Sequence, residues 1–151
     1  MNTSPPPAPV WIVEDDTALA ASLQLLLGAA GLTQTRHFPS ADACLLALPK
    51  AHALPRGAGC MLLDIRLGTV SGIELFAKLR ELEWSWPVIF MTGHGDLQMA
   101  VDLVKQGAFD FVTKPFDPMS LVSKVQQALE VSSQKAQLLL EQQQHLDRLN
   151  S

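Results

Sequence analysis

Short apolar runs recur along the chain, separated by longer stretches in which hydrophobic positions have a helical spacing. The runs predict five strands, at Val10–Val13, Leu32–Phe38, Cys60–Leu63, Val88–Met91 and Asp110–Thr113. Three of these runs are apolar at every position, which is typical of strands buried on both faces of a parallel sheet. The second run alternates polar and apolar residues, so we expect it to form an edge strand.

The stretches between the runs predict helices, because most of them begin at a capping residue and end at Gly or Pro. Their bounds are 17–30, 40–48, 71–82 and 96–106, and a last helix opens at Asp117, followed by Pro118. Asp96 is expected to cap the fourth helix. The alternation predicts an α/β fold, (βα)5, with a parallel sheet, right-handed crossovers and helices on both faces.

Composition divides the chain into three parts. Residues 1–9 (MNTSPPPAP) predict a disordered or extended leader, because Pro lacks the N–H and fixes φ. Residues 10–130 form the body. Residues 131–151 contain no Gly or Pro and are rich in Gln and Leu, so they predict an extension of the last helix. Within it, a spacing compatible with a coiled-coil seam connects Ala136, Leu139, Gln143 and Leu146. A solvated helical tail is the alternative.

The composition also narrows the class of protein. Of the 151 residues, 48% are hydrophobic, which is enough for one packed domain and excludes a wholly disordered chain. A formal net charge of −4 argues against a free nucleic-acid binder. Cys44 and Cys60 fall in apolar segments and fit a reducing compartment better than a disulfide scaffold. No apolar run has the ~20 residues of a membrane helix, so we expect a cytoplasmic protein without a membrane anchor.

Polar residues follow four of the predicted strands. They are Glu14, Asp15 and Asp16 after the first strand, Asp64 after the third, Thr92 after the fourth and Lys114 after the fifth. Parallel strands bring their carboxyl ends to one edge of the sheet, so these side chains are expected to meet there. Singly, each has an ordinary explanation, such as a helix cap for Asp16, a turn hydroxyl for Thr92 or a solvated cation for Lys114.

Together the same residues predict a site for a divalent cation and phosphate. Carboxylates at Glu14, Asp15 and Asp64 would repel one another, and a hard cation removes that conflict. Oxygen ligands completed by water suit Mg²⁺ better than zinc or calcium. One lysine and one hydroxyl beside such a cluster are groups that bind phosphate oxygens.

Four segments resemble the receiver domain of bacterial two-component response regulators. They are IVEDD at 12–16, LLDIRLGTVSGIEL at 62–75, PVIFMTGHGD at 87–96 and GAFDFVTKPF at 107–116. The resemblance covers about residues 10–130. It implies a flavodoxin-like (CheY-like) doubly wound sheet of strand order 2-1-3-4-5, here with an extended C-terminal helix. The later segments most resemble FixJ-type regulators, whose receivers precede a LuxR-type DNA-binding domain.

The resemblance assigns a role to each strand-end residue. Asp64 is implied as the phosphoacceptor, with Thr92 and Lys114 holding phosphoryl oxygens. Mg²⁺ is expected on Asp64, Asp15, Glu14 (through water) and the backbone carbonyl of Arg66. Thr92 and Phe111 are implied as the switch that changes the surface of the fourth helix, fifth strand and fifth helix. Arg66 and His94 occupy positions that tune phosphate lifetime, and the Lys114–Pro115 bond is expected to be cis.

The resemblance further implies a sensor histidine kinase as phosphodonor and a homodimer on phosphorylation. DNA would be bound only through a domain absent from this chain, and residues 131–151 would be the linker to it. A stand-alone receiver that acts by protein contact is the alternative. The chain is not expected to be an enzyme, although it would assist its own phosphotransfer and dephosphorylation.

Two other readings fit the residues less well. A phosphatase of the haloacid dehalogenase type also uses a strand-end Asp, Mg²⁺, Thr and Lys, but it needs a second Asp where this chain has Arg66. A degenerate receiver that binds partners without phosphate is disfavoured because every residue of the acceptor set is present. The loop after the acceptor departs from the family, with Leu67-Gly68 where a Met-Pro pair is common.

Overall fold

The computed structural model describes residues 8–48, 57–68 and 70–150. A five-stranded parallel sheet has the order β2-β1-β3-β4-β5, as the resemblance implies. The strands are β1 (Val10–Val13), β2 (Thr35–Phe38), β3 (Cys60–Asp64), β4 (Val88–Thr92) and β5 (Asp110–Thr113). The helices are α1 (Thr17–Ala29), α2 (Ala41–Ala47), α3 (Gly72–Glu81), α4 (Leu97–Lys105) and α5 (Pro118–Leu149), and a short 3-10 helix, η2, spans His94–Asp96. Most of the predicted leader lies outside the described residues.

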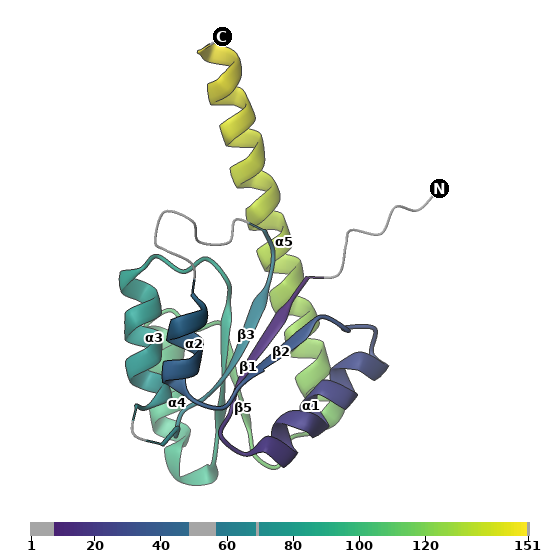
Figure 1. Cartoon of the computed structure of the whole chain (residues 1–151), viewed down its shortest axis with the longest axis vertical. Coiled ribbons are helices and arrows are strands. Elements are labelled where there is room, and N and C mark those ends of the chain that lie inside the picture. The colour runs from purple at the N-terminus through teal and green to yellow at the C-terminus, as the bar shows by residue number, and fades with distance from the viewer. Residues whose placement is uncertain (1–7, 49–56, 69, 151) are drawn as a thin grey trace.

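The helices cover the sheet on both sides, as the alternating pattern predicts (Figure 1). Helices α1 and α5 pack on one face, and α2, α3 and α4 pack on the other. Every residue of β1, β3 and β4 is buried, because these strands lie inside the sheet with a helical layer on each side. Cys44 and Cys60 are both buried and unpaired, one in each layer of the core.

The second strand is shorter than predicted, and one predicted helix cap is not formed. Residues 32–34 are not part of β2, because the ladder with β1 starts at the pair Val10–Thr35. Helix α4 begins at Leu97 with Asp96 at its N-cap position, as predicted, but the Asp96 side chain makes no capping bond.

Helix α5 is anchored in the domain along its first half and projects from it along its second half (Figure 1). Asp117 caps it by accepting a hydrogen bond from the Ser120 amide, and Pro118 occupies its first turn, as predicted. Its last buried residue is Ser132, whose hydroxyl accepts a hydrogen bond from the Gly59 amide at 3.0 Å. The extension predicted for residues 131–151 is helical as far as Leu149, and residue 151 lies outside the described residues. Of its seam residues, 45% of Leu139 and 52% of Leu146 are exposed.

Among the described residues, no helix has both the length and the apolar character that crossing a membrane requires.

The carboxyl ends of the inner strands reach the same edge of the sheet. Asp64 is paired with Met91 in the ladder, and Thr92 is paired with Thr113. Helix α3 begins directly against this edge, because the Gly72 amide donates to the Ile65 carbonyl at 2.9 Å. A side chain at Gly72 would overlap the carbonyl oxygen of Asp64, so the absence of a Cβ permits this close approach. The start of α3 thus packs directly against the backbone of Asp64 and holds it in place.

Candidate functional site

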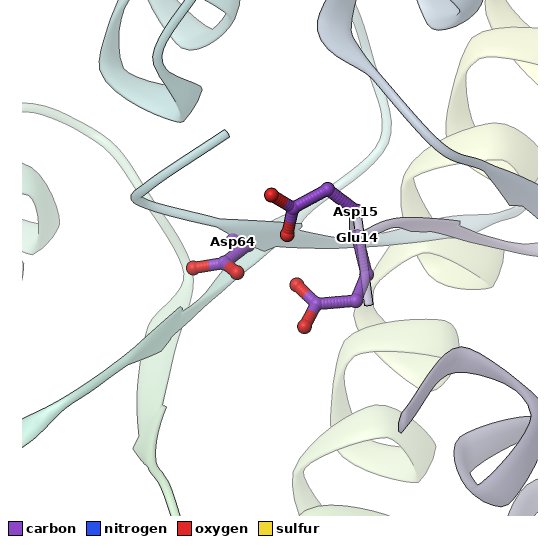
Figure 2. Close-up of side chains that lie close together, drawn as sticks. All are labelled: Glu14, Asp15 and Asp64. Atoms are coloured by element: carbon purple, nitrogen blue, oxygen red, sulfur yellow. The ribbon is translucent and has the colours of Figure 1, made fainter. Parts of the chain in front are cut away.

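Three carboxylates meet at this edge, as the strand-end pattern predicts. Glu14, Asp15 and Asp64 each place an oxygen within 4.8 Å of the others (Figure 2). Glu14 and Asp64 are buried, with 1% and 6% of each residue exposed, while Asp15 lies open to solvent. The neighbouring Asp16 is outside the cluster and caps α1 by accepting a hydrogen bond from the Leu19 amide. One side of the cluster is therefore open to an incoming ligand.

Lys114 joins the two buried carboxylates. Its Nζ lies 3.0 Å from Glu14 Oε1 and 2.9 Å from Asp64 Oδ2. Burial lowers the pKa of Lys114, but its hydrogen bonds with Asp64 and Glu14 outweigh this effect and raise the pKa on balance. Lys114 therefore stays charged and supplies one positive group to the two buried carboxylates. Its peptide bond to Pro115 is cis, as the resemblance implies.

The pKa of Glu14 is raised by burial more than by its acidic neighbours. Burial raises its pKa to about 8, and hydrogen bonding to Asp64 adds to the shift against the opposing effect of Lys114. Its Oε2 atom is buried without a hydrogen-bond partner in the described part of the chain. An unpartnered buried oxygen beside two further carboxylates fits a bound cation, directly or through water. All-oxygen donors suit Mg²⁺, so the residues present fit the predicted metal.

Thr92 lies beside the cluster at the end of β4. Only 1% of it is exposed, and its hydroxyl donates to the Gly93 carbonyl at 3.0 Å. Its own carbonyl accepts from the Lys114 amide at 2.7 Å, which ties the ends of β4 and β5 together. The Gly93 carbonyl also accepts a hydrogen bond from the Asp96 amide at 3.1 Å, so it keeps one donor when the hydroxyl turns away.

Phe111 lies half-buried on β5 and packs against the core layer of α3 and α4. Lys124 of α5 donates to the Phe111 carbonyl at 2.7 Å, and its Nζ is 5.5 Å from the centre of the Phe111 ring. A direct contact therefore links β5 to α5 next to the proposed switch residue.

The loop after β3 completes the surroundings of Asp64. The Arg66 amide donates to Asp64 Oδ1 at 3.1 Å, and a groove of about 350 Å³ borders Asp15, Arg66 and Gly68. The Arg66 side chain turns to Asp96 and not to the acceptor. His94 is exposed in η2. Sequence reasoning missed the pair of Arg66 with Asp96, because it treated Asp96 as a helix cap.

Comparisons with known proteins agree with this geometry. The sequence model of the response regulator receiver domain family matches residues 10–126 of this chain. The transcriptional regulatory protein FixJ of Azorhizobium caulinodans is 39% identical over 131 residues, covering 87% of this chain and 59% of that protein. The response regulator protein TodT of Pseudomonas putida is 36% identical over 126 residues, covering 83% of this chain and 53% of its own length.

Solved structures show the same likeness. The response regulator StyR superposes with a TM-score of 0.84 at 31% identity, covering 97% of this chain and 71% of that one. Full-length FixJ from B. japonicum gives 0.75 at 33% identity, covering 86% of this chain and 61% of that one. The chain thus spans little more than half the length of the curated relatives that it matches.

Proposed function

The chain belongs to the response regulator receiver family, and on that premise we propose that Asp64 accepts a phosphoryl group from a sensor histidine kinase. One observation carries the proposal: the buried Asp64 carboxylate lies within 4.8 Å of two other acidic side chains and is bound by Lys114. The transfer forms a bond between an Asp64 oxygen and phosphorus. It breaks the phosphorus–nitrogen bond of the donor, whose electron pair stays on the imidazole nitrogen.

Each neighbour of Asp64 has a task in this proposal. Lys114 would hold a phosphoryl oxygen by charge, and Thr92 would hold another by a neutral hydrogen bond. Phosphoryl transfer depends on positioning and charge stabilisation more than on acid–base chemistry, so no general acid is needed. Arg66, which stands where a phosphatase of the haloacid dehalogenase type requires an Asp, supports a receiver over that enzyme. The chain would then be no enzyme, although it assists its own phosphotransfer and dephosphorylation.

The proposed metal ligands are Glu14, Asp15, Asp64 and the backbone carbonyl of Arg66. When bound, Mg²⁺ would offset the repulsion between these carboxylates and the incoming phosphoryl group. The unpartnered Oε2 of Glu14 supports this assignment.

The first prediction concerns uptake of phosphate. With acetyl phosphate and Mg²⁺, the wild type should gain one phosphoryl group, and Asp64→Asn should gain none, because the amide is not a nucleophile toward phosphorus. Intact mass measures both, and a chelator should stop the labelling. Labelling of Asp64→Asn to the level of the wild type would contradict the proposal.

The signal would leave the site through Thr92 and Phe111. A phosphoryl group on Asp64 would draw the Thr92 hydroxyl away from the Gly93 carbonyl and open space behind it, into which Phe111 turns. Phosphate would thereby shift a two-state equilibrium of the face formed by α4, β5 and α5. The contact of Lys124 with Phe111 supports this route, since it joins α5 to the moving residue.

The output that we propose is control of transcription through a LuxR-type DNA-binding domain beyond residue 151. The partial coverage of the curated relatives and the long helix α5 support this reading. A receiver that acts alone by protein contact is the second candidate. A cytoplasmic location, implied by the family, belongs to the same proposal.

The second prediction concerns self-association. Phosphorylation should strengthen a homodimer through α4, β5 and α5, with Leu139 and Leu146 of the tail pairing in parallel. A coupling of about 1–3 kcal/mol would tighten the dimer by one to two decades. Sedimentation with the phosphate mimic beryllofluoride measures the dimer. Leu139→Ser should weaken the dimer, and Leu140→Ser, which lies outside the seam, is its control. A mimic-bound protein that stays monomeric at tens of micromolar would contradict this output while leaving Asp64 as acceptor.

A further inference from the structure

An ion pair beside the acceptor joins two loops at the same edge of the sheet. Arg66 Nε donates to Asp96 Oδ2 at 2.6 Å, and Arg66 Nη2 donates to Asp96 Oδ1 at 2.7 Å. Two parallel bonds of this kind form the strong, geometrically specific pairing of a guanidinium with a carboxylate. The pair ties the loop after β3, which carries the acceptor, to η2, which follows Thr92.

The two partners are buried to very different extents. The Asp96 side chain is 7% exposed, whereas the Arg66 side chain is 76% exposed. In the described part of the chain, Arg66 is the sole hydrogen-bond partner of the Asp96 carboxylate. A buried carboxylate is costly without a partner, so Asp96 fixes the position of Arg66 more than the reverse.

Asp96 makes this pair in place of a local interaction. It stands at the N-cap position of α4, where an Asp side chain ordinarily accepts a hydrogen bond from the helix backbone. Here its side chain makes no such bond. The Asp96 carboxylate therefore binds Arg66 and not the backbone of α4.

The guanidinium that Asp96 holds belongs to a residue already in contact with the acceptor. The Arg66 amide donates to Asp64 Oδ1 at 3.1 Å, and its side chain is long and reaches into solvent. A free guanidinium binds phosphoryl oxygens through two parallel bonds, as it does carboxylates. While Asp96 occupies Nε and Nη2, that edge of Arg66 is withheld from a phosphoryl group on Asp64.

We propose that Asp96 is a positioning residue that sets the lifetime of the phosphorylated state by holding the Arg66 guanidinium away from the phosphorylated acceptor. The inference rests on the proposed role of Asp64. Hydrolysis forms a bond between a water oxygen and phosphorus and breaks the bond between phosphorus and the Asp64 oxygen. The electron pair returns to the Asp64 carboxylate, and both protons of the water leave with the inorganic phosphate as dihydrogen phosphate. A freed Arg66 covers the phosphoryl oxygens and slows the approach of that water.

The test compares rates of dephosphorylation. Wild type, Asp96→Asn and Asp96→Ser are phosphorylated with acetyl phosphate and Mg²⁺, the donor is removed, and intact mass follows the decay. Asn and Ser both retain the ability to cap α4, so these variants are expected to fold, and thermal unfolding checks this. In both variants the rate of hydrolysis should fall by about tenfold, so the half-life of the phosphoprotein should lengthen by the same factor.

A variant cycle separates this role from a structural one. In an Arg66→Ala background, Asp96→Asn should produce no further change, because the guanidinium that it frees is absent. Asp102→Asn is the matched control, since it removes one exposed carboxylate from α4 that contacts Gln98 and not Arg66. It should leave the half-life unchanged.

Three results would overturn the proposal: an unchanged half-life in both Asp96 variants, a shortened one, or equal lengthening with and without Arg66. Failure of the wild type to take up phosphate is a different result, since it would contradict the function of Asp64 itself.

Discussion

Replacing Asp15 by alanine is expected to lower Mg²⁺-dependent phosphorylation by more than about a hundredfold. Loss of a residue that only supports a metal ligand already costs up to about a hundredfold, and Asp15 is a proposed ligand itself. Asp15 is the exposed member of the carboxylate cluster and borders the open groove. Removal of one negative charge from a crowded group should leave the stability of the metal-free protein unchanged or slightly higher. Mg²⁺ titration and labelling with acetyl phosphate measure the loss, and thermal unfolding measures stability.

The neighbouring Asp16 provides a matched control. It is also exposed and lies one residue further along, but its carboxylate caps α1 and is not part of the cluster. Asp16→Ser removes the same charge from the same loop and keeps a capping side chain. This variant should phosphorylate like the wild type. If Asp15→Ala also phosphorylates normally, Asp15 is an ordinary loop carboxylate and the metal assignment is wrong.

Replacing Gly72 by alanine is expected to have the largest effect on stability, together with a large loss of activity. The added Cβ would overlap the Asp64 carbonyl oxygen and lie 2.9 Å from the Asp64 carbonyl carbon. These are backbone atoms, so no side-chain rotation relieves the overlap. We expect a loss of about 3 kcal/mol in the free energy of unfolding, or about 10 °C in Tm. Displacement of the acceptor should slow labelling by about a hundredfold.

Gly28→Ala is the control for Gly72→Ala. Gly28 lies in α1, and a Cβ there would have no neighbour within 4 Å. Alanine in a helix is favoured over glycine by about 0.5–1 kcal/mol, so this variant should be slightly more stable. Thermal unfolding and acetyl phosphate labelling of both variants give the comparison. A Gly72→Ala protein with wild-type stability and labelling would show that α3 does not fix the acceptor backbone.

The strand-end residues were predictable from the sequence because a parallel sheet leaves little choice. Once Cys60–Leu63 and Val88–Met91 are recognised as buried strands, Asp64 and Thr92 must reach the same edge. Lys114 follows by the same reasoning from β5. The sequence therefore predicts which strand ends meet, and the structure brings Asp64 together with Glu14, Asp15 and Lys114.

The contacts between loops were not predictable in the same way. Arg66 and Asp96 are separated by a whole helix and strand, and nothing in the local sequence distinguishes Asp96 from an ordinary helix cap. The raised pKa of Glu14 likewise depends on how deeply β1 is buried at its end. The close approach of Gly72 to Asp64 is a property of the packed backbone, which residue patterns do not encode.

The assignment of Asp64 is tested most directly by locating the phosphoryl group. Wild-type protein labelled with acetyl phosphate and Mg²⁺ is reduced with borohydride, which converts an aspartyl phosphate into homoserine and leaves free carboxylates intact. Peptide mass spectrometry then identifies the reduced residue. We expect homoserine at position 64 and at no other acidic position. Reduction at Asp15 or Asp16 with Asp64 unchanged would contradict the assignment.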